Sequence, residues 1–124
     1  MHHILIIEDE IDLREALQLF LKNEGYSVHA TETSAQGLKL LSEHVPDIIL
    51  LDMMTHSLHG IEFLAELRKL PDPVGKAKVI VLTNLDAEIT QEQAEKYGVS
   101  DYLVKASTPL KEIVNRVREV LSAA

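Results

Sequence analysis

The chain has 124 residues, of which 46% are hydrophobic and 26% are charged, as is ordinary for one soluble globular domain. Its formal net charge of −8 opposes binding to nucleic acid phosphates. The chain contains no cysteine, which excludes disulfides and thiol chemistry, and no apolar run approaches the roughly 18 residues of a membrane helix. We expect a cytoplasmic protein with no membrane contact and no direct nucleic acid binding.

Short apolar runs alternate with helical stripes along the whole chain. The runs have the length of strands, and they are residues 3–7, 26–30, 48–51, 79–82 and 101–104. In the first stripe the apolar residues recur with the helical period, at Leu13, Ala16, Leu17, Phe20 and Leu21. Later helices are predicted from Ser34 as a cap, from Ile61, over about 87–97, and after Thr108 or Ser107 as a cap with Pro109 in the first turn.

The alternation repeats five times, with connections too long for hairpins, and this predicts right-handed strand-helix-strand crossovers. The fold class is therefore α/β, a single doubly wound parallel sheet with helices on both faces. In such a sheet the strand ends line one edge, with neighbouring strands about 4.8 Å apart. The polar residues that follow the buried runs should converge there, and they are Glu8, Asp9, Asp52, Thr83 and Lys105.

Carboxylates this close together either share protons or bind a cation, and oxygen ligands without His or Cys favour Mg²⁺. A Mg²⁺ ion held by carboxylates keeps positions open for phosphate oxygens. Lys105 and Thr83 can bind the same phosphoryl group, and Asp52 could act as nucleophile and form an aspartyl phosphate. Taken singly, each residue has another explanation: a surface lysine, a helix cap, or acidic residues at a helix start.

These residues stand in motifs that resemble the receiver domain of two-component response regulators. The resemblance covers essentially the whole chain, and its pieces are residues 4–10, residues 47–52 with Gly60 eight positions after Asp52, residues 79–83, and residues 98–105.

The resemblance implies a flavodoxin-like (βα)5 fold with strand order 2-1-3-4-5, formed by one receiver domain over residues 1–124 with no output domain present. It implies that Asp52 accepts phosphate from a histidine kinase or phosphotransfer protein, and that Mg²⁺ is bound by Glu8, Asp9, Asp52 and the Met54 carbonyl. Thr83 and Lys105 would bind the phosphoryl group, and Tyr102 would move inward with Thr83. The chain would be no enzyme beyond its own phosphorylation and dephosphorylation, and would signal to a downstream protein or a missing output domain.

The sequence departs from the family pattern near the site. His56 and Ala106 stand where family members usually carry proline, so the Lys105–Ala106 bond is expected to be trans or strained. Asn84 replaces a small residue after Thr83, and Met54 adds an apolar side chain two residues after Asp52. These departures suggest slow phosphorylation or a long-lived phosphoryl state.

Other polar residues have less defined expectations. His56 and His59 form a His-x-x-His pair that is expected to face solvent rather than to bind metal. Related transcription-factor receivers pair across a dimer at the positions of Asp101 with Arg116 and of Gln91 with Glu112, whereas Lys96 and Arg118 would repel there. We expect a monomer or weak homodimer.

Three alternative functions remain open from the residues. The first is a pseudo-receiver, an interaction module without phosphorylation, which Asn84 and Ala106 allow. The second is a Mg²⁺-dependent phosphohydrolase, although Met54 stands where such enzymes carry a second aspartate. The third is a flavin carrier, which the acidic residues 8–10 disfavour because they would repel its phosphate.

Overall fold

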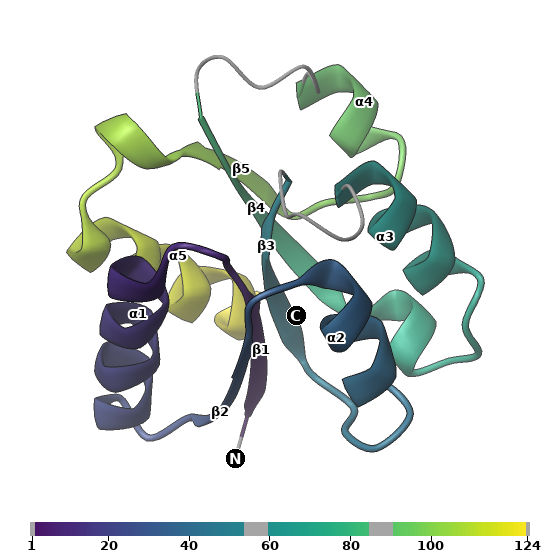
Figure 1. Cartoon of the computed structure of the whole chain (residues 1–124), viewed down its shortest axis with the longest axis horizontal. Coiled ribbons are helices and arrows are strands. Elements are labelled where there is room, and N and C mark those ends of the chain that lie inside the picture. The colour runs from purple at the N-terminus through teal and green to yellow at the C-terminus, as the bar shows by residue number, and fades with distance from the viewer. Residues whose placement is uncertain (1, 54–59, 85–90, 124) are drawn as a thin grey trace.

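The computed structural model describes residues 2–53, 60–84 and 91–123. A parallel five-stranded sheet lies between two layers of helices (Figure 1). The strands are β1 (His3–Ile7), β2 (Ser27–Thr31), β3 (Ile48–Asp52), β4 (Lys78–Thr83) and β5 (Asp101–Val104). The helices are α1 (Ile11–Asn23), α2 (Ser34–Leu40), α3 (Gly60–Arg68), α4 (Gln91–Glu95) and α5 (Leu110–Ser122), with 3-10 turns η1 (Val74–Lys76) and η2 (Lys105–Ser107).

The sheet has the strand order β2-β1-β3-β4-β5, which confirms the predicted fold class and order. The order reverses beside β1, because β2 pairs on one side of it and β3 on the other. Helices α1 and α5 cover one face of the sheet, and α2, α3 and α4 cover the other (Figure 1). The carboxyl ends of β1 and β3 therefore meet at a switch point of the chain, where open α/β sheets place their ligands.

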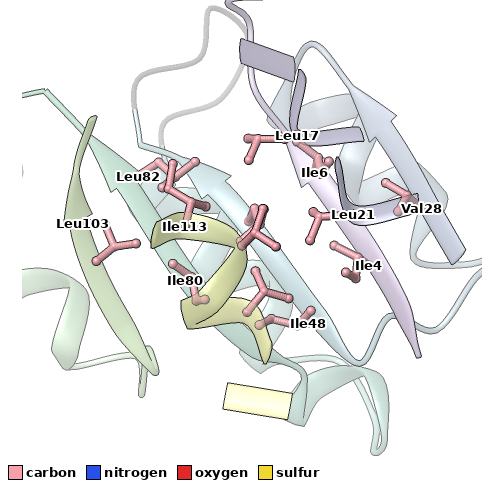
Figure 2. Close-up of a cluster of buried hydrophobic side chains, with 13 residues drawn as sticks. Ile4, Ile6, Leu17, Leu21, Val28, Ile48, Ile80, Leu82, Leu103 and Ile113 are labelled. Carbon is pink, nitrogen blue, oxygen red and sulfur yellow. The ribbon is translucent and has the colours of Figure 1, made fainter. Parts of the chain in front are cut away.

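Two apolar clusters hold the helices against the sheet. Successive strand residues point to opposite faces, so Ile4 and Ile6 enter one cluster while Leu5 and Ile7 enter the other. Figure 2 shows the first cluster, in which Leu17 and Leu21 of α1 and Ile113 of α5 lie over the strands. Burial on both faces explains why the central strands β1, β3 and β4 are nearly continuous apolar runs in the sequence.

Three details of the helices differ from the sequence prediction. Phe20, assigned to the buried stripe of α1, is 49% exposed, because it lies at the margin of that stripe. The cap of α2 is Thr33, whose hydroxyl accepts from the Gln36 N–H, and not Ser34, which is buried inside the helix. The cap of α5 is Pro109, and neither Thr108 nor Ser107 takes that position.

Helix α4 is short where the structure describes it. Residues 87–90, the first part of the helix predicted over 87–97, lie outside the described residues. Between Gln91 and Glu95 the only buried side chain is Ala94, and Tyr97 packs partly buried against the second apolar cluster. The expected sparse apolar contact between this helix and the sheet is therefore present in the described part.

Candidate functional site

The five predicted site residues lie at the carboxyl edge of the sheet. Asp52 is the last residue of β3 and Thr83 the last of β4, whereas Glu8 and Asp9 follow β1 directly and Lys105 follows β5. Strands β1, β3, β4 and β5 are consecutive neighbours, so four adjacent strand ends supply all five side chains. The parallel register keeps them level, since Ile7 pairs with Leu51 and Thr83 with Val104.

The three acidic residues form one cluster. An oxygen from each of Glu8, Asp9 and Asp52 lies within 4.8 Å of the oxygens from the other two. Glu8 and Asp52 are buried, with 0% and 3% exposure, and Asp9 is half-buried at the entrance. Carboxylates held this closely with little water are stabilised by a cation.

The carboxylates fit a hard divalent cation such as Mg²⁺. All the offered atoms are oxygens, and one of them, Glu8 Oε1, is buried and accepts no hydrogen bond of standard geometry from the described residues. Its close contact is an ion pair with Lys105. Met54, whose carbonyl was assigned as a further ligand, lies outside the described residues.

Lys105, which follows the edge strand β5, reaches the acidic cluster with its side chain. Its Nζ lies 2.6 Å from Glu8 Oε1 and 3.3 Å from Asp52 Oδ2. The side chain is 11% exposed, so the ammonium group is largely removed from water. Lys105 therefore makes its shorter contact with Glu8 and still lies within reach of Asp52.

Burial and charge shift the pKa values of this pair. Burial raises the pKa of Glu8 to about 7 from 4.5, and the Asp52 charge adds to the rise, while Lys105 and the Glu10 N–H oppose it. Burial lowers the pKa of Lys105, but contact with Glu8 and then with Asp52 outweighs this effect and raises it above its usual value. At neutral pH Lys105 is therefore a cation.

The backbone around Glu8 is held by several hydrogen bonds. Glu8 Oε2 accepts from the Glu10 N–H at 3.0 Å, and the Glu8 N–H donates to the Thr31 carbonyl at 3.0 Å. Arg14 Nη1 of α1 donates to the Glu8 carbonyl at 2.9 Å. The sequence prediction missed the contact of Arg14 with this loop. The position of Arg14 in the sequence does not indicate the contact, because the acceptor is a backbone carbonyl.

The hydroxyl and the aromatic residue of the predicted switch are also near the edge. Thr83 is buried, and its Oγ1 donates to the Asn84 carbonyl at 3.3 Å. Asn84 itself is exposed. Tyr102 is half-buried and packs against the second apolar cluster.

The segment that begins at Lys105 forms a 3-10 turn with trans backbone at Lys105–Ala106. Among the residues that the structure describes, Asp72–Pro73 is the only cis peptide bond. The Lys105–Ala106 bond is therefore trans, and a trans bond was one of the two expected outcomes. Lys105 begins the 3-10 turn η2.

The start of α3 lies against the residue that follows β3. His56 and His59 lie outside the described residues, as does Met54. The Gly60 N–H donates to the Met53 carbonyl at 2.9 Å, and a Cβ on Gly60 would lie 2.7 Å from Met53 Cα. A side chain at position 60 is therefore excluded without movement of the end of β3.

The residues expected at a dimer contact have partners within the chain. Arg116 Nη1 lies 2.6 Å from Asp101 Oδ2, and Arg116 also pairs with Glu112 at 3.5 Å. Gln91 donates to Glu95 within α4 at 3.0 Å. In this single chain these groups have local partners.

One protein family model matches most of the chain. The model of the response regulator receiver domain family matches residues 4–118. The chain belongs to this family. Among the residues that the structure describes, this receiver domain has no helix long and apolar enough to cross a membrane.

Curated relatives of the receiver domain are named as transcriptional regulators. This chain is 36% identical over 119 residues to the uncharacterized transcriptional regulatory protein YkoG of Bacillus subtilis, and the match covers 96% of this chain and 50% of the relative. It is 33% identical over 120 residues to the probable transcriptional regulator ycf27 of Cyanidium caldarium, covering 97% of this chain and 46% of the relative. The receiver domain thus spans about half the length of these relatives.

Solved structures share its fold. A DNA-binding response regulator of the LuxR family from Staphylococcus aureus is 28% identical with a TM-score of 0.84, covering 98% of this chain and 100% of that one. A putative response regulator from Chloroflexus aurantiacus is 25% identical with a TM-score of 0.84, covering 98% of both chains.

Proposed function

We propose that this receiver domain is a phosphorylation-dependent switch in which Asp52 accepts a phosphoryl group. The observation that supports this most directly is the arrangement around Asp52. It is a buried carboxylate with Glu8 and Asp9 as acidic neighbours and with the Lys105 ammonium 3.3 Å from its Oδ2. Such an arrangement is typical of a site that receives an anionic group next to a cation.

In the proposed reaction an Asp52 carboxylate oxygen attacks phosphorus, and the bond from phosphorus to the donor breaks with its electron pair remaining on the donor. Bound by Glu8, Asp9 and Asp52, Mg²⁺ would supply positive charge next to the phosphoryl oxygens. Lys105 would move its ammonium group from Glu8 onto a phosphoryl oxygen. The Thr83 hydroxyl would turn from the Asn84 carbonyl to donate to a second oxygen.

The consequence would be a changed surface. The rotation of Thr83 would open space toward β4, and Tyr102 of β5 would move inward to fill it. The surface formed by α4, β5 and α5 would then bind its partner differently. We infer that the phosphodonor is a histidine kinase or phosphotransfer protein in the cytoplasm. The changed surface would act on a downstream protein or an output domain. A transcriptional role in a longer protein would agree with the names of the curated relatives.

The test is a mass measurement. The purified chain is incubated with Mg²⁺ and acetyl phosphate, and intact mass spectrometry is expected to show one phosphoryl group per chain. Asp52→Asn should abolish the adduct. Asp47→Asn changes a carboxylate next to the opposite end of β3 and should leave it intact.

Two outcomes separate the alternatives. An adduct that survives in Asp52→Asn would place the acceptor elsewhere and reject the assignment. A folded wild-type chain that shows no adduct with acetyl phosphate or with a histidine kinase would be a pseudo-receiver. Decay of the adduct after removal of the donor measures the predicted long lifetime.

A further inference from the structure

The turn that carries Lys105 is closed by a side chain. The Thr108 Oγ1 donates to the Val104 carbonyl at 2.7 Å, across the whole of η2. The backbone contact that closes the same turn is longer, with the Thr108 N–H 3.4 Å from the Lys105 carbonyl. The Ser107 Oγ also lies 3.4 Å from the Val104 carbonyl, but Ser107 is exposed. The shortest hydrogen bond across the turn is therefore that of Thr108.

The local sequence directs the Thr108 hydroxyl toward this carbonyl. Because Pro109 follows, Thr108 is confined to extended backbone, and it has φ −118° and ψ 104°. Pro109, rather than Thr108, is the cap of α5 and offers no side-chain cap. The hydroxyl of Thr108, expected to cap α5, instead reaches back four residues.

The position of this hydrogen bond matters for the site. Val104 is the residue immediately before Lys105, so its carbonyl belongs to the peptide unit from which the Lys105 side chain begins. Lys105 has a long flexible stem, and its Nζ must reach two particular oxygens, at 2.6 Å in Glu8 and at 3.3 Å in Asp52. Ala106, which follows, is small and exposed.

We propose that Thr108 is a positioning residue for Lys105, with its hydroxyl holding the Val104 carbonyl so that the ammonium group is aimed at Glu8 and Asp52. The role in phosphoryl transfer rests on the proposed function, but the role in placing Lys105 does not. Thr108 acts through the backbone and touches neither the acids nor a phosphoryl group. It also links the start of α5 to the geometry of the site.

The test compares Thr108→Val, which keeps the shape and removes the hydroxyl, with Thr108→Ser, which keeps the hydroxyl. The first readout is the NMR signal of the ¹⁵N-labelled Lys105 ammonium group without any phosphodonor. We expect this signal to shift and lose protection from hydrogen exchange in Thr108→Val, and to be retained in Thr108→Ser. The matched control is Ser107→Ala, which removes the longer contact to the same carbonyl and should leave the signal unchanged.

The second readout is the rate of adduct formation with acetyl phosphate and Mg²⁺. Thr108→Val is expected to be slower by about three- to tenfold, the factor for one hydrogen bond of ordinary strength. Thr108→Ser should restore the rate. Thermal unfolding of each variant, followed by circular dichroism, establishes that the compared chains are folded at the assay temperature.

Each result decides the proposal. An unchanged Lys105 signal in folded Thr108→Val would overturn it, as would failure of Thr108→Ser to restore the signal, since packing and not the hydroxyl would then be responsible. If the wild-type chain forms no adduct, the proposed function fails, and the ammonium spectra alone still decide whether Thr108 places Lys105.

Discussion

At the amino edge of the sheet, two half-buried cations, Arg68 and Lys78, bind backbone carbonyls, whereas at the carboxyl edge Lys105 lies against carboxylates. Arg68, at the end of α3, donates to the carbonyls of Tyr97, Gly98, Gly75 and Ala77, at 2.7, 3.3, 3.1 and 2.8 Å. Lys78 donates to the carbonyls of Val120 and Ala123 at 2.8 Å each. Lys105 instead meets Glu8 and Asp52.

The difference lies in what the partner can do. A carbonyl has a fixed dipole that neither titrates nor leaves, so contacts at the amino edge hold the ends of α4 and α5 throughout the pH range in which Glu8 titrates. A buried carboxylate changes its charge with pH and binds cations, so the contacts at the carboxyl edge respond to conditions. The same kind of side chain thus stabilises the fold at one edge and forms a responsive site at the other.

The largest effect is expected from Arg68→Met. The variant leaves four carbonyls without their guanidinium donor and should lower the free energy of unfolding by roughly 2–4 kcal/mol. Arg68→Lys should recover only part of this loss, because an ammonium group cannot reproduce the planar fork. Urea unfolding measures the loss, and hydrogen exchange should rise first in α4, where Ala94 is the only buried side chain between Gln91 and Glu95.

The control for Arg68 is its neighbour. Lys69 directly follows α3, is 72% exposed and pairs with Glu66 on the surface, so Lys69→Met should leave stability nearly unchanged. Equal losses in both variants would mean that the carbonyl contacts of Arg68 contribute nothing specific.

The second prediction concerns the carboxyl edge and pH. The folded-state pKa of Glu8 is about 7 against 4.5 for the free group, so the folded chain holds a proton that the unfolded chain releases between these values. This contribution to stability is present below pH 4.5 and is lost as pH rises toward 7. Glu8→Gln should remove that decline, so that its free energy of unfolding in metal-free buffer changes less between pH 4.5 and pH 7 than that of the wild type.

Urea unfolding of both chains across this pH range, with a chelator present, measures the difference. The stability of Arg68→Met, by comparison, should follow the wild-type pH dependence at a lower level. If wild type and Glu8→Gln have the same pH dependence, the contrast between the two edges is wrong.

The smallest effect is expected from Lys78→Met. The loss of two carbonyl contacts at the end of α5 should lower the free energy of unfolding by about 1–2 kcal/mol. Faster hydrogen exchange should appear in the last turn of α5, around Val120 to Ala123. Lys76→Met serves as the control, because Lys76 is 78% exposed and pairs only with Asp72 among the described residues. Unchanged exchange in the last turn of Lys78→Met would show that apolar packing alone holds α5.

The sequence predicted the sheet well because both faces of the three central strands β1, β3 and β4 are buried. The runs 3–7 and 101–104 coincide with β1 and β5, β3 is one residue longer at its end than predicted, and β2 and β4 differ by one residue at each end. The same pattern placed Glu8, Asp9, Asp52, Thr83 and Lys105 at one edge, since a parallel sheet brings its strand ends together. Their proposed roles in phosphoryl transfer go beyond this placement.

The details that the sequence prediction missed depend on competition between similar neighbours or on backbone acceptors. Thr33 and Ser34 are both good caps, and only the folded chain decides between them. The hydroxyl of Thr108 has the Val104 carbonyl as a competing partner. Arg14, Arg68 and Lys78 bind carbonyls, and because every residue carries a carbonyl, no spacing of side chains reveals such contacts.

The hydrogen bond from the Thr108 hydroxyl to the Val104 carbonyl also determines how fast the turn around Lys105 can open and close. Breaking one hydrogen bond and turning one side chain takes nanoseconds to microseconds, whereas phosphoryl transfer by kinases proceeds at about 1–100 per second. The turn around Lys105 would therefore open and close many times before each transfer. The placement of Lys105 is then a population, and a substitution at position 108 changes how often the ammonium group is in place rather than whether it can arrive.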